Sequence, residues 1–173
     1  MENGSQKTSG NGTAGELQMT FTIDNVIKSI AAFIARTFTD GDGKAIYKVY
    51  DNVNQQGTEF PCFFIFLMPS GIEDQVDERQ IRTLAFDLVF VQQRNITDGR
   101  TQINRIVEEL DFGMDPLPYL SNGETVPLHL SGREVSIEDD EMHYKFTIKA
   151  RVSKPKAENP MNQMEETNVE VRE

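Results

Sequence analysis

The feature that most constrains this chain is an apolar run between two prolines. Residues 62–68, CFFIFLM, contain no polar side chain, and Pro61 and Pro69 stand at the two ends of the run. A run this short, bounded by prolines, favours a β-strand over a helix. Because neighbouring side chains of a strand point to opposite faces, both faces of this strand are apolar. We therefore predict a central strand in a sheet that is covered on both sides.

The sequence that follows predicts a partner for this strand. Residues 83–92 alternate, with leucine or phenylalanine at every second position from 84 to 90. Such alternation is typical of a strand with one buried face. A polar, acidic connection, residues 70–80, joins the two segments. We therefore predict that they pair in an antiparallel arrangement.

Two other segments carry apolar residues at helical spacing. Residues 23–38 and residues 97–111 both repeat apolar side chains every three or four positions, which predicts amphipathic helices. Thr22 is the expected N-cap of the first helix, and Thr97 or Asp98 that of the second, because their side-chain oxygens can accept hydrogen bonds from the first turn.

The remaining strands complete an α+β pattern. A short strand is expected within residues 45–53, two more at 125–130 and 133–138, and a long alternating one at 142–152. The order is helix, strands, helix, strands. It predicts an α+β fold in which a mainly antiparallel or mixed sheet of about four to six strands packs with two principal helices.

Composition divides the chain into one domain and two terminal segments. Residues 1–18 are rich in Gly, Ser, Thr and Asn, and they predict a disordered N-terminal extension. Residues 153–173 predict a flexible acidic C-terminal tail, which leaves residues 19–152 as the domain. Neither a secretory signal nor an apolar run long enough for a bilayer is visible, so we expect synthesis in the cytoplasm.

The sequence offers little catalytic chemistry. Its single cysteine, Cys62, excludes an internal disulfide and is interpreted as a small buried hydrophobe. The only histidines, His129 and His143, have no metal-ligand spacing, and DGDGK at residues 40–44 lacks the later ligands of a calcium loop. No nucleophile or phosphate-binding motif occurs. We therefore predict no enzyme, and no catalytic, metal-binding or cofactor-binding residue.

Charge patterning points to contact surfaces. The formal net charge of -11 argues against a general nucleic-acid-binding surface. The outward face of the last strand is basic, and the connection after the apolar run is acidic. Several interpretations of these charges stay open. The charged side chains are solvated or pair with one another, or the carboxylates bind a divalent cation weakly. The alternative is that both sets of residues form a contact between subunits. The candidate subunit-contact residues are Lys145, Lys149, Arg151, Glu73, Asp74 and Asp77.

The middle of the chain also carries a pattern of particular residues. Residues 46–92 follow an amphipathic helix and combine a tyrosine, a Gln-Gly pair, a proline and two aromatic strands. The residues that carry the pattern are Tyr50, Gln56, Gly57, Pro61, Phe63, Phe64 and Phe86. The pattern resembles the tail terminator, or tail completion, proteins of long-tailed bacteriophages. In the order of its elements the resemblance covers roughly residues 20–150.

The resemblance implies a structural virion protein at the head-proximal end of the tail, made in the host bacterial cytoplasm. Such proteins form a homo-hexameric ring that caps the tail tube, stops its elongation and docks to the neck or head-completion protein. Genomic DNA passes through the lumen without specific contacts. The tape measure protein is a further expected partner, and no membrane is expected.

Other classes of function remain open on the sequence alone. They are another neck or head–tail joining ring component or a tube-like subunit, a small non-enzymatic binding module, and an enzyme. A ring predicts self-association, a binding module predicts a monomer with an exposed apolar patch, and an enzyme predicts a cleft with perturbed ionisable groups.

Overall fold

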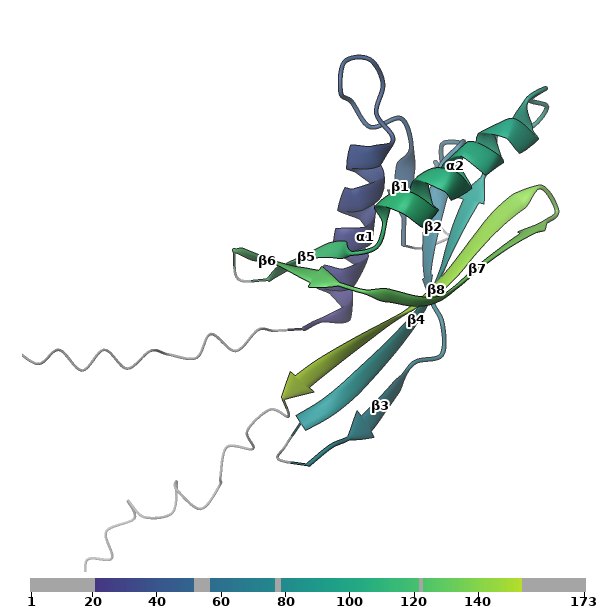
Figure 1. Ribbon diagram of the computed structural model, residues 1–173. Coiled ribbons are helices and arrows are strands. Elements are labelled where there is room, and N and C mark those ends of the chain that lie inside the picture. The colour runs from purple at the N-terminus through teal and green to yellow at the C-terminus, as the bar shows by residue number, and fades with distance from the viewer. Residues whose placement is uncertain (1–20, 52–56, 77–78, 122, 154–173) are drawn as a thin grey trace, which may run out of the picture.

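The computed structural model describes residues 21–51, 57–76, 79–121 and 123–153, drawn in colour in Figure 1. The predicted terminal segments, residues 1–18 and 153–173, lie outside these residues, apart from Ser153. The elements are α1 (Ile23–Thr37), β1 (Lys48–Tyr50), β2 (Cys62–Leu67), β3 (Gly71–Asp74), β4 (Arg79–Val91), α2 (Gly99–Gly113), β5 (Leu117–Ser121), β6 (Glu124–Leu128), β7 (Leu130–Glu138) and β8 (Glu141–Ser153). This arrangement confirms the α+β prediction.

The main sheet has six strands, with the path β1-β2-β4-β8-β7 and with β3 paired to β4 beyond the end of β2. The predicted antiparallel pairing of the apolar run is confirmed, because Phe63 lies opposite Phe90 and Ile65 opposite Leu88. Strand β1 pairs parallel to β2, so the sheet is mixed. The central strand is β4, and the prediction that residues 62–68 form it is wrong.

Local chemistry explains where the first helix begins and ends. The Asn25 backbone N–H donates to Thr22 Oγ1 at 3.2 Å, which confirms Thr22 as the N-cap of α1. After the helix, Asp40 Oδ1 accepts hydrogen bonds from the backbone N–H groups of Asp42 and Lys44. Residues 40–44 therefore form a tight turn after the helix, and the side chain of Asp40 stabilises it. At α2 the N-cap is Asp98, without a side-chain capping bond.

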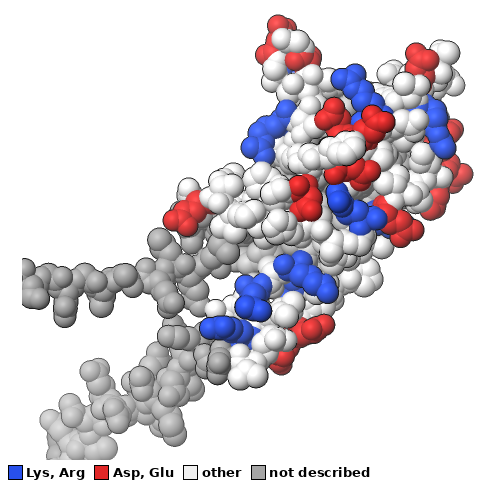
Figure 2. Space-filling view, viewed as in Figure 1, with Lys and Arg blue, Asp and Glu red and all other residues white. Residues whose placement is uncertain are grey.

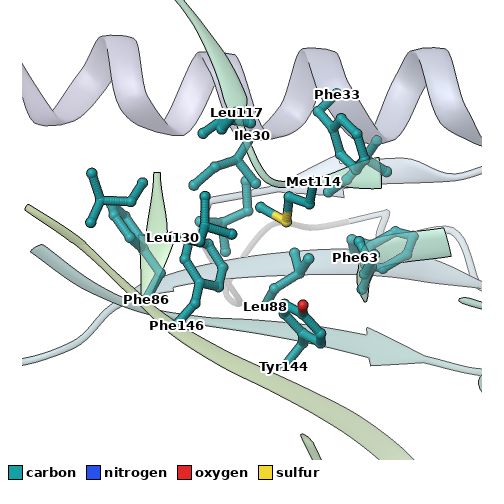
Figure 3. Packing of buried hydrophobic residues seen from close by; sticks show 14 of the residues in the cluster. Ile30, Phe33, Phe63, Phe86, Leu88, Met114, Leu117, Leu130, Tyr144 and Phe146 are labelled. Carbon is teal, nitrogen blue, oxygen red and sulfur yellow. The ribbon is translucent and has the colours of Figure 1, made fainter. Parts of the chain in front are cut away.

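Both helices pack on the same face of the sheet. Ile30 and Phe33 of α1 lie across from Phe63, Leu88 and Tyr144 of the strands, as Figure 3 shows. Alternate residues of β2, β4 and β8 complete this core together with the apolar stripe of α2. The strand alternation predicted for residues 83–92 and 142–152 is confirmed, because one set in each strand is buried here.

Within the described residues, no helix packs on the opposite face of the sheet. The prediction that the apolar run is covered on both sides is therefore wrong. A small second cluster lies on this face instead, formed by Cys62, Phe64 and Val89 with Tyr50, Phe66 and Val91 packed beside them. In the described structure, helices cover only one of the two apolar faces that the sequence of β2 presents.

Two strands lie where the sequence predicts connections. Strand β3 is formed by part of the acidic connection, and it pairs with the beginning of β4. Strand β5 forms a hairpin with β6 beside the start of α1 (Figure 1). The backbone N–H of Thr22 donates to the Tyr119 hydroxyl at 3.2 Å, and the Phe21 ring lies 5.5 Å from that of Tyr119. These contacts fix the hairpin to the helix.

One end of the sheet projects past the helices. Strand β3 pairs with residues 80–83 of β4, and residues 149–153 of β8 pair with the same part of β4 from its other side. Figure 1 shows these segments extending away from both helices. We call this three-stranded projection the arm. Its strands have the helix-covered core on neither face, so its side chains are available for contacts.

Candidate functional site: the helix-free face of the sheet

The face of the sheet opposite the helices, here called the helix-free face, is formed by alternate residues. It includes Cys62, Phe64 and Phe66 of β2, the odd-numbered residues 83–91 of β4 and the odd-numbered residues 141–151 of β8. Strands β4 and β8 pair without a register shift over their whole length. Side chains on this face therefore lie in straight rows from the arm to the opposite end of the sheet.

A groove occupies the end of this face farthest from the arm. Its volume is about 1340 Å³, and its apolar lining includes Phe64, Phe66, Val89 and Val91. Phe60, at the entrance to β2, also lines it and is 50% exposed. The loop after β4 and the turn between β7 and β8 supply its polar rim. An open groove with an aromatic floor can accept apolar side chains of another segment.

A buried polar pair stands beside the groove. His143 Nδ1 lies 2.9 Å from Asp87 Oδ2, and Asp87 is only 7% exposed. The other carboxylate oxygen, Oδ1, is buried and has no hydrogen-bond partner in the described structure. His143 lines the groove and Asp87 comes from the neighbouring strand. The pair fixes the orientation of the imidazole, and it holds an acceptor oxygen that is unused within this part of the chain.

The chemistry of Cys62 agrees with its sequence interpretation. The side chain is fully buried, and that burial raises the pKa of the thiol to about 11, with a smaller contribution from the negative charge of Glu141. A thiol with this pKa carries almost no thiolate at neutral pH. Cys62 therefore acts as a small apolar side chain.

The basic residues predicted as subunit contacts share the helix-free face. Lys145 lies next to the Asp87 row, and Lys149 and Arg151 continue along β8 into the arm. We call Lys145, Lys149 and Arg151 the basic strip. Among the described residues, no ion pair within 4.0 Å links the strip to a carboxylate. Figure 2 shows Lys and Arg side chains over the arm, together with Asp and Glu side chains.

The acidic residues of that prediction separate. Glu73 faces the same side as the strip, because it pairs with Ile81, which in turn pairs with Arg151. Asp74 faces the opposite side of the arm, and its Oδ1 accepts a hydrogen bond from Gln80 Nε2 at 2.9 Å. Asp77 lies outside the described residues. The structure therefore brings Glu73 together with the strip and places Asp74 elsewhere.

The residues that carry the resemblance have two different positions. Phe63 and Phe86 lie in the helix-covered core, where Phe63 packs 4.9 Å from Phe90 and Phe86 packs 5.6 Å from Phe146, between ring centroids. Tyr50 and Phe64 pack on the helix-free face, with ring centroids 5.6 Å apart.

The loop before β2 holds the other residues of the pattern. Gly57 has a φ of +86°, a conformation that favours glycine. The backbone N–H of Glu59 donates to the Tyr50 hydroxyl at 3.1 Å, which ties this loop to the end of β1. Pro61 immediately precedes β2, and Gln56 lies outside the described residues. This pattern is structural, since its members shape the aromatic strand and its loop.

A second hollow, of about 500 Å³, lies between the C-terminal end of α1, the N-terminal end of α2 and β1. On its lining, Gln102 Nε2 donates to the Tyr47 hydroxyl at 3.0 Å. The described residues include no group of three side chains able to hold a metal ion. Neither α1 nor α2 is long and apolar enough to cross a bilayer. The groove on the helix-free face is the larger of the two hollows, at about 1340 Å³.

Comparison with known families identifies the fold. A family model described as phage tail terminator protein matches residues 25–160. The chain belongs to the phage tail terminator family. The match spans nearly all of α1 and every strand of the main sheet, and it confirms the resemblance drawn from Tyr50 to Phe86. No curated protein matches the chain.

Membership defines the general role of this tail terminator protein. The family is one of structural phage tail proteins, so the protein is a component of the phage tail. The sequence patterns that could identify the family were structural, namely the aromatic strand, its preceding loop and the order of elements. The groove and the Asp87–His143 pair were not predicted, because they depend on the register between β4 and β8.

Proposed function

We propose that this protein forms a hexameric ring that caps the head-proximal end of the phage tail tube. The ring stops elongation of the tube and provides the surface to which the neck or head-completion protein docks. The observation that carries the proposal is the family match, which extends over residues 25–160 and so covers the whole fold. A match of that extent concerns the architecture of the subunit and not a single shared motif.

The shape of the subunit supports a ring. Closed rings are built from head-to-tail contacts, in which two different patches of the same chain meet. The arm offers exposed side chains on both of its faces, because Ile72 on β3 is 57% exposed and Glu73, the next residue, points to the opposite face. The basic strip and Glu73 are our proposed subunit-contact residues on the helix-free face. Asp74, on the other side of the arm, and Asp77 stay predictions as contacts.

Overall charge supports the passage of DNA through the lumen. Each lysine or arginine that contacts a phosphate increases the affinity for DNA in a salt-dependent way. A ring of subunits that each carry a formal charge of -11 has little net attraction for a polyanion. Genomic DNA can then slide through the lumen. The further partners in this role are the tail tube protein and the tape measure protein.

The proposal is tested by mass and by tube length. Light scattering after size exclusion, over a range of concentrations and salt, should give the mass of a hexamer. Adding the ring to growing tubes of the cognate tail tube protein should shorten them, with a cap visible at one end by electron microscopy. A chain that stays monomeric with the tube protein present and leaves tube length unchanged would contradict the proposal.

The same assay distinguishes the related structural roles. A tube-like subunit would be incorporated along the tube and would lengthen it. A neck component would ignore bare tubes and bind only tubes that already carry a terminator. An excess of a non-interacting acidic protein of similar size serves as the control for non-specific effects on polymerisation.

A further inference from the structure

The helix-free face combines two features that call for a particular kind of partner. The groove presents an apolar floor, and the basic strip presents cations whose carboxylate partners are missing from the described part of the chain. Strand β8 joins them, because His143 lines the groove and Lys149 lies further along the same face. A segment that fits this face must be acidic at one point and apolar at another.

The chain itself contains such a segment. Residues 157–173, here called the acidic segment, contain five glutamates and one arginine. They also contain four apolar side chains larger than alanine, Met161, Met164, Val169 and Val171. By contrast, residues 1–20 contain only two glutamates, with a lysine between them. Charge complementarity therefore favours the C-terminal segment over the N-terminal one.

The spacing of the acidic segment matches the face. Lys149 and His143 are six residues apart on β8, and Glu165 and Val171 are six residues apart in the segment. At about 3.3 Å per residue both spacings are roughly 20 Å when extended. With Glu165 at Lys149, Val171 reaches the groove, and Arg172 comes next to the acidic turn at residues 139–140.

We propose that the acidic segment of one copy binds along the helix-free face of the next copy, its glutamates on the basic strip and its valines in the groove. This inference rests on the proposed ring. Donor and acceptor are different parts of the chain, and this is the head-to-tail geometry that a closed ring needs. It also supplies, from a neighbour, the carboxylates that the strip lacks.

The direction of β8 favours a neighbour over the same copy. The strand ends at Ser153 on the arm, at the end of the sheet away from the groove (Figure 1). To return over its own face with Glu165 at Lys149, the chain would have to reverse its direction between residues 154 and 164. Two lysines, Lys154 and Lys156, follow directly after Arg151 in the sequence, and repulsion between these like charges disfavours a tight reversal there. A segment that continues in the direction of β8 leads away from its own groove and toward another copy.

Two charge-reversed full-length variants test the contact. The face variant is Lys149→Glu/Arg151→Glu, and the segment variant is Glu165→Lys/Glu166→Lys. Each places like charges against each other, so each should raise the concentration for half-assembly at least about tenfold at low salt, with a smaller effect at high salt. The matched controls are Arg36→Glu/Lys44→Glu, off the helix-free face, and Glu2→Lys/Glu16→Lys. Both controls should assemble like the wild type.

Mixing the two variants identifies the source of the segment. In a ring where they alternate, every acidic segment meets a basic strip and every reversed segment meets a reversed strip, so assembly should return to near the wild-type concentration. A third chain carries all four changes of the two variants. If assembly returns in this chain but not in the mixture, the segment binds the face of its own copy, and the proposal is overturned. Unchanged assembly of both variants would also overturn it, while the proposed ring would stand.

A labelled peptide of residues 157–173 separates failure of the ring from failure of this contact. Fluorescence anisotropy should show that it binds the full-length wild-type chain and binds the face variant at least about tenfold more weakly. If the wild-type chain never assembles but binds the peptide in this way, the ring fails and the contact stands. A peptide that binds neither chain would overturn the contact whatever the mass of the protein.

Discussion

Phe63 and Phe64 are neighbours of the same residue type, and the structure predicts that replacing them has different consequences. Phe63 is fully buried in the helix-covered core, where its ring lies 4.9 Å from that of Phe90 and 5.7 Å from that of Phe38. Phe64 points to the other face, where it lines the groove and packs against Tyr50. Sequence alone treats the two positions as equivalent, so the pair tests the one-sided arrangement of the helices.

The expected magnitudes follow from what each ring leaves behind. Phe63→Ala creates a closed cavity between helices and sheet, and it should lower the free energy of unfolding by about 3–5 kcal/mol. Phe64→Ala opens onto the groove, where water can enter, so the loss should be close to the transfer free energy of the ring, roughly 2–3 kcal/mol. The difference between the two variants should be at least about 1 kcal/mol.

Aspartate substitutions enlarge the contrast. Phe63→Asp adds the cost of a buried, unpaired carboxylate to the cavity, several kcal/mol in effective terms, and the sum approaches the whole stability of a typical domain. We expect that variant not to fold. The carboxylate of Phe64→Asp can reach water in the groove, so we expect a folded but weakened protein whose assembly is impaired.

Urea unfolding followed by far-ultraviolet circular dichroism measures both pairs. The free energies of unfolding can be compared when their slope against urea concentration is the same for wild type and variant. Equal losses for Phe63→Ala and Phe64→Ala, or a cooperative unfolding transition for Phe63→Asp, would refute the placement of the Phe63 ring between the helices and the sheet and of the Phe64 ring beside the open groove.

Three further predictions concern single side chains. Burial, followed by the hydrogen bond to Asp111, raises the pKa of Tyr144 to about 12. The wild type should therefore lose stability between pH 10 and 12, by up to about 1.4 kcal/mol per pH unit relative to Tyr144→Phe. Urea titrations at each pH measure this loss. The loss has this sign because the unfolded chain releases the phenolic proton first. Burial raises the pKa of Cys62 from 9.0 to about 11. The wild type should therefore lose stability in the same way between pH 9 and 11, and Cys62→Ala should remove this loss. Iodoacetamide should label Cys62 far more slowly in the folded wild type than in the urea-unfolded chain. Thr22→Ala removes the N-cap of α1 and should cost about 1 kcal/mol, whereas Thr39→Ala, at an exposed position after the helix, should cost much less by the same urea measurement.

The elements that the sequence predicted well are those with a strong period. The helix that begins at Ile23 and the last strand, from residues 142 to 152, each carry one unbroken apolar stripe, and both elements were placed to within a residue or two. Strands β3 and β5 were missed because their hydrogen bonds depend on partners far along the chain. In β3, Gly71 to Asp74 read as a polar connection until β4 pairs with them.

The candidate site was predictable only in part, and for a physical reason. Alternation alone placed Lys145, Lys149 and Arg151 on one outward face, because a strand repeats every second residue. The groove needs the register that brings Val89 of β4 beside Phe64 of β2 and His143 of β8. A single sequence carries no direct signal for that register. An aspartate within the apolar strand β4, at position 87, was the one visible sign of a polar feature there.

The error about the apolar run also has a consequence for assembly. The sequence from Cys62 to Leu67 predicts a strand buried on both faces, yet in the part of the chain that the structure describes helices cover only one face of it. Cys62 and Phe64 are already buried on the second face, but the groove beside them is open and Phe60 at its entrance is 50% exposed. Covering such apolar surface is favourable, since burying one apolar side chain is worth about 1.5–3 kcal/mol. On the proposed contact, the second face is covered when the acidic segment of a neighbour lies in the groove. Both apolar faces of β2 are then fully covered in the ring, whereas in the isolated chain helices cover only one of them. Substitutions at Phe64 or Phe66 should accordingly impair assembly more than their effect on subunit stability alone would require.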